Sequence, residues 1–423
     1  MVDAGEVRRR SGLIKTLGPG IIYAGAAIGV SHLVQSTRAG AGYGFALLGI
    51  ILLVNLFKYP FFEFGHRYSA ATGESMLTGY RRVGRWALGI FLLVSFGSGM
   101  PTLAAVTLVA AGLATHLFPG GLTALEWSAI LVAFSLLLMA VGGYPWLDGL
   151  MKLMMVFLVI STVVAVVAAC FHKFEHAPDF TPPTVWNRTG VMFVIALMGW
   201  MPTPVDISAW PSLWMRERRI QTGHQPTLGE ALFDFNLGYG ATTVMAVLFL
   251  CLGALVMFGS GVTFASAAPA FAGQLISMYT TALGGWSRPF ILTAAFTCML
   301  STTITVLDGY PRVIAAGVCE WGLITGRNEK KWYWVLNLLM CGGALAIIAW
   351  LPQRSMLALV GFITTVAFLS APLLAWLNHL TLKKAGLPPE AAPPAWLWWL
   401  SRAGIVFLLG FSCLYIWSQV KGG

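Results

Sequence analysis

Long apolar runs separated by short polar loops dominate the chain. A helix needs about 20 mostly apolar residues to cross the hydrocarbon core of a bilayer. Eleven segments meet that requirement, at 18–41, 45–66, 87–112, 124–143, 149–171, 189–213, 233–258, 288–316, 332–351, 355–380 and 396–418. Runs of this length favour spanning helices, so the pattern predicts an all-α integral membrane protein.

The composition agrees with this pattern. Of the 423 residues, 57% are hydrophobic and only 10% are charged, whereas soluble domains carry roughly a quarter charged residues. A water-exposed surface cannot be covered by so few charges. The lipid bilayer is therefore the expected partner. The length then indicates one transmembrane domain over 1–423, with residues 1–17 as a cytoplasmic N-terminal segment.

Basic residues set the predicted orientation. With the N-terminus in the cytoplasm, 17 lysines and arginines fall on the cytoplasmic side and five on the other. The cytoplasmic set is Arg8, Arg9, Arg10, Lys15, Arg67, Arg81, Arg82, Arg85, Lys152, Arg216, Arg218, Arg219, Arg327, Lys330, Lys331, Lys383 and Lys384. The positive-inside rule therefore predicts a multi-pass protein of the inner (plasma) membrane with its C-terminus outside. It also explains the net charge of +10 without nucleic acid.

Cysteine spacing and motifs argue against other classes. The six cysteines are widely spaced and form no CxxC or Cys/His cluster, so neither a disulfide framework nor a zinc site is expected. No cleavable signal peptide is expected, because the first apolar run is long enough to span. The chain carries no nucleophile elbow, phosphate loop or plausible carboxylate pair, so we expect no enzyme, and no obligate protein partner is evident.

Two spans are predicted to be broken. The first contains Gly18-Pro19-Gly20, Gly25 and Gly29, and the sixth contains Gly199-Trp200-Met201-Pro202. Glycine and proline weaken a helix interior, and proline also removes a backbone donor. Interrupted spans at matching positions of two halves point to the midplane site of a transporter.

Several motifs resemble the Nramp family of divalent-metal transporters, in order along nearly the whole chain. They are Gly18-Pro19-Gly20, Ala39-Gly40, Tyr43-Gly44, Val54-Asn55-Leu56, Ala71-Thr72-Gly73, Tyr144…Leu147-Asp148 as a turn before the fifth span, Met201-Pro202, Ser301-Thr302-Thr303-Ile304-Thr305 and Pro372-Leu373-Leu374. The resemblance implies a LeuT-type fold that works by alternating access. Its 5+5 inverted repeat would cover 18–171 and 189–380, with 396–418 as an extra eleventh helix.

The departures from the family pattern concern its metal site. Counted from Gly18, the family's metal-binding Asp falls on Gly29 and its Asn on His32. The liganding methionine is kept as Met201, the residue whose carbonyl contributes falls on Met198, and the following histidine becomes Thr203. The family's third helix carries acidic residues, but 86–119 contains no Asp or Glu here.

These substitutions shape the predicted substrate site. Hard and borderline divalent ions need negatively charged oxygen ligands, and Gly29 supplies none. We therefore predict a site for a small non-metal solute, either an anion, a zwitterion or a polar molecule. The predicted substrate-binding residues are Gly29, Ser31, His32, Met198, Trp200, Met201 and Thr203; if a metal binds after all, His32 and Met201 are the candidate ligands.

Coupling is predicted from residues further along the chain. Hydroxyls of Ser301, Thr302 and Thr305 in the eighth span could form a Na⁺ site with carbonyls of the first span, as the LeuT-type resemblance implies, although such hydroxyls often bond their own helix. Ionisable residues inside spans are costly and functional by default. Asp206 and Asp308 are the leading candidates for proton carriers or gating pairs, with structural pairing to Lys58 or Arg312 as the alternative.

Three functions follow. The first is a secondary transporter of a small non-metal solute, with Na⁺ or H⁺ as the candidate coupling ion and no other cofactor. The second is a proton-coupled divalent metal ion transporter with an altered metal site. The third is a membrane sensor or scaffold that has lost transport. The absence of an appended soluble domain counts against this third function.

Overall fold

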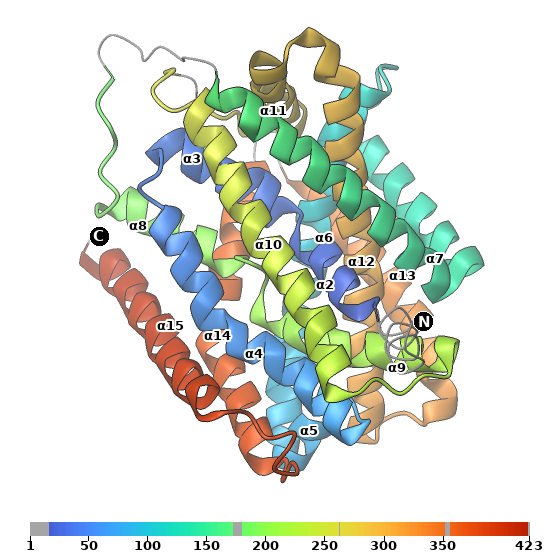
Figure 1. Ribbon diagram of the computed structural model, residues 1–423. Coiled ribbons are helices and arrows are strands. Elements are labelled where there is room, and N and C mark those ends of the chain that lie inside the picture. The colour runs from blue at the N-terminus through green and yellow to red at the C-terminus, as the bar shows by residue number, and fades with distance from the viewer. Residues whose placement is uncertain (1–16, 172–179, 262, 352–355, 422–423) are drawn as a thin grey trace, which may run out of the picture.

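The computed structural model describes residues 17–171, 180–261, 263–351 and 356–421. Over these residues all regular structure is helical, and the helices form one bundle (Figure 1). Helices α5 and α9 lie at one end of the bundle and α11 at the other (Figure 1); we call these ends the α5/α9 face and the α11 face.

The first half of the chain runs from α2 to α7. It comprises α2 (Pro19–Ala27), a π-helical turn (Ser31–Ser36), α3 (Thr37–Tyr43), α4 (Leu48–Thr72), α5 (Met76–Val83), α6 (Arg85–Leu117) and α7 (Ala124–Cys170).

The second half runs from α8 to α14, and α15 follows it. It comprises α8 (Arg188–Gly199), a 3₁₀ turn (Val205–Ala209), α9 (Trp210–Thr222), α10 (Leu228–Val256), α11 (Ala268–Leu283), α12 (Arg288–Trp321), α13 (Glu329–Trp350), α14 (Met356–Lys384) and α15 (Ala395–Lys421). Short 3₁₀ turns at Gly285–Ser287 and Gly326–Asn328 precede α12 and α13.

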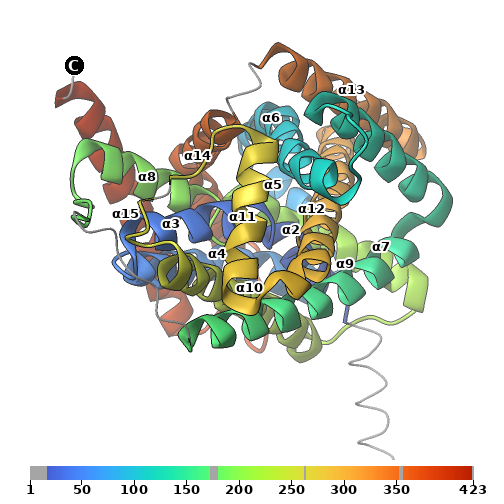
Figure 2. The ribbon, with the colours of Figure 1, turned by 90° about the horizontal axis from the view of Figure 1, so that it is seen from above.

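The bundle has a lipid-facing exterior. Among the described residues, eight helices are long and apolar enough to cross a membrane, and large apolar side chains such as Leu93, Val141 and Val406 are more than two-thirds exposed. Of the most apolar window of α12, 83% is buried, compared with 17% for α15. The helix α12 is therefore the central one, and α15 lies at the periphery (Figure 2).

Both predicted breaks are present. The first span ends as a helix at Ala27 and resumes after Gly29, and the sixth ends at Gly199 and resumes through the 3₁₀ turn into α9. Pro202 and Pro204 lie in the second break, where they cannot donate backbone hydrogen bonds. Outside a helix, the freed backbone groups need other partners in a lipid environment, so the two breaks create polar backbone in the bundle interior.

The prediction that the fourth and fifth spans are two separate helices is wrong. We expected spans at 124–143 and 149–171 with a turn at Tyr144…Leu147-Asp148, but helical backbone continues from Ala124 to Cys170. The direction changes along the way, since the teal and green parts of α7 run along different sides of the bundle (Figure 2). Gly142-Gly143 and Pro145 lie between the two predicted spans, yet the backbone stays helical there.

Two helices were not predicted. The short α5 follows the second span, and α11 lies within the loop that we placed between the seventh and eighth spans. At 16 residues α11 is too short to cross a bilayer, and it crosses the bundle end against α6 and α7. The sixth span is also longer than expected, because α9 continues to Thr222.

Glycines allow α2 to lie directly on α10. A Cβ atom on Gly238 would come within 2.1 Å of the Gly20 carbonyl oxygen, and one on Gly20 within 2.1 Å of the Asp234 carbonyl oxygen. The Asp234 carboxylate accepts hydrogen bonds from the backbone N–H groups of Gly18 (3.2 Å) and Gly20 (2.6 Å). The otherwise unpaired N-terminal donors of α2 are thereby capped from α10.

We expect Gly238→Ala to destabilise the protein, because the added methyl group meets backbone atoms that cannot move independently. Gly240→Ala is the matched control, since a Cβ atom there meets nothing within 4 Å and alanine favours a helix by about 1 kcal/mol over glycine. Thermal unfolding in detergent should show a lower midpoint for Gly238→Ala and an unchanged or higher one for Gly240→Ala. Equal midpoints would contradict this close packing.

Candidate functional site

A small cavity lies between the two helix breaks. Its volume is about 20 Å³, enough for roughly one water molecule. The lining residues come from the first span, α6, the second break and α12: Ala26, Ala27, Val30, Ser31, Thr102, Val106, Trp200, Thr203, Pro204, Ile207, Thr302 and Val306. Four helices that are distant in sequence thus meet at one midbundle point.

The structure brings part of the predicted site together. Ser31, Trp200 and Thr203 from the predicted substrate set line the cavity, together with Thr302 from the predicted coupling set. Gly29, His32, Met198 and Met201 are buried beside the breaks but do not line it. Thr102 and Val106 of α6 are additional lining residues that sequence reasoning did not identify.

The cavity lining is mostly apolar and contains no charged side chain. Its lining includes hydroxyls and the indole of Trp200, whose Nε1–H is buried without a hydrogen-bond partner among the described residues. A buried unpaired donor costs roughly 1–3 kcal/mol. The Trp200 N–H therefore favours an acceptor, either water or an oxygen of a bound solute.

Gly29 is in close contact with α12. A Cβ atom built at Gly29 would lie 2.6 Å from Thr302 Oγ1 and 2.7 Å from Thr302 Cγ2. No larger side chain fits at position 29 unless Thr302 or the backbone shifts. Position 29 has no carboxylate, and the packing of Thr302 against it leaves no space for one.

Both ring nitrogens of His32 bond within the protein. Nε2 lies 2.9 Å from the Thr242 carbonyl oxygen of α10, and Nδ1 lies 2.7 Å from Ser31 Oγ. Because a carbonyl only accepts, Nε2 carries a proton and is unsuited to ligate a metal in this arrangement. Ser31 Oγ also lies 2.7 Å from the Ala27 carbonyl oxygen, and its single proton can bond either that carbonyl or Nδ1 of a neutral His32, but not both at once.

The altered-metal-site prediction finds few ligands nearby. Met198 and Met201 are fully buried, and the described part of the chain contains no cluster of three or more His, Cys, Asp or Glu residues arranged to hold a metal ion. Thioethers alone are soft ligands that suit Cu(I) rather than Mn²⁺ or Fe²⁺.

Thr302 connects α12 to the first break. Its Oγ1 lies 3.2 Å from the Gly25 carbonyl oxygen, 3.3 Å from that of Ile28 and 3.2 Å from that of Cys298. A hydroxyl has one proton, so it satisfies only one of these carbonyls at a time. Cys298 Sγ also donates to the Ile28 carbonyl (3.0 Å), so two side-chain donors of α12 reach the first break. The Thr305 hydroxyl instead bonds the Ser301 carbonyl one turn earlier (2.8 Å).

Lys58 and Asp206 lie at the second break. The Lys58 ammonium donates to the carbonyls of Met198, Gly199 and Thr203, and Asp206 acts on it electrostatically from the 3₁₀ turn. Asp206 accepts a hydrogen bond from Tyr310 of α12 (3.0 Å). The sequence marked Lys58 as an ionisable residue inside a span, but only the fold reveals what it contacts.

An aromatic layer separates the cavity from the α5/α9 face. Trp210 packs edge-on against Tyr310 with ring centroids 4.7 Å apart, and against Trp214 at 5.8 Å. Gly309 makes this possible, since a Cβ atom there would come within 2.2 Å of the Trp210 ring. All three rings are at most 1% exposed, so they close this side of the cavity.

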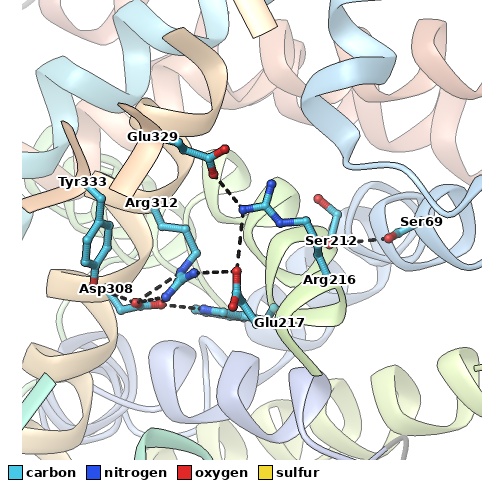
Figure 3. Close-up of polar contacts among 9 residues, drawn as sticks. Ser69, Ser212, Arg216, Glu217, Asp308, Arg312, Glu329 and Tyr333 are labelled. Atoms are coloured by element: carbon cyan, nitrogen blue, oxygen red, sulfur yellow. Dashed lines mark hydrogen bonds and ion pairs between the residues drawn. The ribbon is translucent and has the colours of Figure 1, made fainter. Parts of the chain in front are cut away.

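Below the aromatic layer, an ion-pair network joins α9 to α12 and α13 (Figure 3). Asp308 Oδ1 accepts from Arg312 Nη2 (2.6 Å) and Tyr333 (2.9 Å), and Oδ2 accepts from Trp214 Nε1 (2.8 Å). Arg312 also pairs with Glu217 (3.1 Å), and Arg216 pairs with Glu329 (2.7 Å).

These groups line a pocket of about 670 Å³. The structural pairing of Asp308 with Arg312 that we considered is therefore present. It is also part of the contact that fastens α9 to α12.

Comparisons with known proteins agree with this architecture. A family model described as "Natural resistance-associated macrophage protein-like" (Nramp) matches residues 20–418. An uncharacterized protein of Pasteurella multocida (strain Pm70) is 39% identical over 409 residues, covering 95% of this chain and 92% of that protein.

Solved structures show the fold. A manganese transporter of Eremococcus coleocola matches with a TM-score of 0.74 at 15% identity, covering 100% of this chain and 90% of that one. The structure of MhsT in complex with L-phenylalanine matches with a TM-score of 0.58 at 16% identity, covering 93% and 98%. The LeuT-type fold that the family resemblance implies is confirmed.

We expect Asp308→Ala to loosen the closure at the α5/α9 face, because it removes the acceptor shared by Trp214, Arg312 and Tyr333. Breaking a buried ion pair costs about 3–5 kcal/mol, so hydrogen exchange of residues 205–214 should rise by about tenfold or more. Glu74→Ala is the control, since its pair with Arg82 (2.6 Å) is half exposed and such pairs contribute about 0–1 kcal/mol. Unchanged exchange in Asp308→Ala would exclude a closing role.

Proposed function

Because this chain belongs to the Nramp family, and is thus an integral membrane protein of a transporter family, we propose that it is a secondary transporter of a small non-metal solute. The solute is an anion, a zwitterion or a polar molecule that binds between the two helix breaks. The transporter works by alternating access. We propose the class of the solute and not its identity.

The packing of Gly29 against Thr302 carries this proposal. A divalent cation leaving water needs negatively charged oxygens to offset its lost hydration. Position 29 has no carboxylate, and a Cβ atom there would lie 2.6 Å from Thr302 Oγ1. The cavity lining adds no charge of its own. A free Mn²⁺ or Fe²⁺ ion would therefore stay uncompensated in a low-dielectric interior.

The polar groups at the cavity suit an acceptor-bearing solute. The unpaired Trp200 N–H and the Thr203 hydroxyl can donate hydrogen bonds, whereas the Ser31 proton is already engaged by Ala27 or His32. The cavity of about 20 Å³ fits a closed conformation, so binding a larger solute requires the breaks to move apart. Such motion of broken helices is the basis of alternating access in this fold.

Two arrangements support alternating access. The aromatic layer and the Asp308 network drawn in Figure 3 close the α5/α9 face, while α11 crosses the opposite end (Figure 1). Each barrier consists of side chains or a short helix that can separate without unfolding a spanning helix. A cycle in which one barrier opens while the other holds would expose the cavity to each side in turn.

We favour Na⁺ over H⁺ as the coupling ion. The Thr302 hydroxyl and the carbonyls of Gly25, Ile28 and Cys298 supply oxygens at the junction of the first break and α12. Oxygen ligands suit a hard monovalent cation, and the absence of Asp and Glu from 86–119 removes the acidic residues that the family resemblance would assign to proton passage.

The alternative is a divalent metal ion transporter with an altered site, which the family and the manganese transporter of similar fold favour. It would need His32, Met201 and backbone carbonyls as ligands. His32 would have to release Thr242 or Ser31 first.

We expect Mn²⁺ uptake into proteoliposomes to equal that of protein-free liposomes, because the site lacks negative ligands. A panel of small organic and inorganic anions, amino acids and neutral polar solutes, assayed in parallel, should contain a solute that accumulates. Trp200→Phe should weaken that uptake by removing the N–H donor while keeping most of the aromatic volume. Mn²⁺ uptake that His32→Ala abolishes would overturn the proposal in favour of the altered metal site.

For the solute identified in that panel, replacing external Na⁺ by choline should reduce uptake by about tenfold or more, since one well-made cation contact is worth over 1.4 kcal/mol. Thr302→Val, which keeps the shape and removes Oγ1, should abolish the dependence on Na⁺. Thr303→Val is the control, because the Thr303 hydroxyl bonds only the Met299 carbonyl of its own helix (2.9 Å). Uptake that is unchanged without Na⁺ and is driven by an imposed pH gradient would exclude sodium coupling.

A further inference from the structure

Lys58 is a fully buried lysine bonded to backbone carbonyls. It lies near the middle of α4 and is 0% exposed. Its Nζ donates to the carbonyl oxygens of Met198 (2.7 Å), Gly199 (2.9 Å) and Thr203 (3.4 Å). All three acceptors belong to the end of α8 or to the break that follows.

The second break explains why a cation is held there. The last carbonyls of a helix have no intrahelical partner, and they form the negative end of the helix dipole. In a membrane interior no bulk water reaches them. Gly199 also lies directly on α14, since a Cβ atom there would come within 1.8 Å of the Thr364 carbonyl oxygen. The packed end of α8 therefore depends on a donor supplied by another helix.

The ligands of the Lys58 ammonium are those of an ion site. Carbonyl ends of broken half-helices coordinate monovalent cations in transporters of this architecture. Here three carbonyls converge on the nitrogen of a side chain. The one carboxylate that acts on Lys58, Asp206, does so at longer range and is itself bonded to Tyr310.

We propose that Lys58 is the resident cation of this transporter, and that its tethered ammonium occupies a carbonyl site at the end of α8 that would otherwise bind a free monovalent cation. Thr203 accepts from Lys58 and also lines the central cavity. A positive charge is thereby fixed next to the solute site. Coulomb repulsion by this charge is twice as strong for a divalent as for a monovalent cation at the same distance, so Lys58 disfavours divalent cations in the cavity.

The test replaces the tethered cation by a free one. Lys58→Ala removes the side chain beyond Cβ, and n-propylammonium reproduces the missing atoms from Cγ to Nζ. Thermal unfolding of the purified full-length variant in detergent should begin roughly 5 °C or more below the wild type. Excess n-propylammonium should restore at least half of that difference, whereas n-propanol, of similar size and no charge, should restore little.

Two controls separate this result from general effects of the amine. Wild-type protein should gain nothing from n-propylammonium, because its site is filled. Asn55→Ala removes a buried polar side chain one turn away on α4, whose Nδ2 bonds the Ile51 carbonyl of its own helix (2.8 Å), and it should not respond either. Equal stabilisation by propanol, or equal gains in all three proteins, would overturn the proposal.

If Lys58→Ala does not survive purification, the folded yield on size exclusion becomes the measurement. Membranes solubilised with n-propylammonium should give monodisperse protein, and those solubilised with n-propanol should not; no recovery with the amine would also overturn the proposal. Because these measurements report stability and not transport, their failure would leave the uptake experiments on the solute class unaffected.

Discussion

Unpaired backbone in a lipid-covered interior is the constraint on which the rest of this structure depends. Two spans stop being helical at the centre of the bundle, and the carbonyl and N–H groups set free there cannot turn to water. Neighbouring helices supply donors to carbonyls at both breaks: Lys58 of α4 donates at the end of α8, and Thr302 of α12 at the end of α2. The helices around the breaks are thus held by the same bonds that shape the site.

Close glycine contacts set the dimensions of that site. Gly20 and Gly238 bring α2 onto α10, Gly29 brings the first break onto Thr302, and Gly309 admits the Trp210 ring. A methyl group at any of these positions would separate two elements by more than the local packing allows. The small cavity volume follows from these contacts. So does the exclusion of an acidic side chain from position 29.

The charges are arranged in two groups with different tasks. At the second break, Lys58 and Asp206 are buried and bonded to carbonyls and to Tyr310, where a charge can influence what enters the cavity. Towards the α5/α9 face, Asp308 and Arg312 of α12 pair with Glu217 of α9, and Tyr333 of α13 bonds Asp308 (Figure 3). Such a network can open and re-form as the helices move, whereas the Lys58 contacts are made to the backbone of the site itself.

The sequence by itself determined the membrane class and the two breaks, because run length, glycine and proline act locally. It also marked Ser31, Trp200, Thr203 and Thr302, which meet at the cavity. It could not reveal that the backbone of α7 stays helical through Gly142-Gly143 and Pro145, or that α11 crosses the bundle end, since packing against other helices decides both. Only the tertiary structure decided that Lys58 reaches the carbonyls of α8 and that His32 turns to Thr242. These contacts join residues more than 100 positions apart, and a partner that far along the chain is chosen by packing and not by sequence pattern.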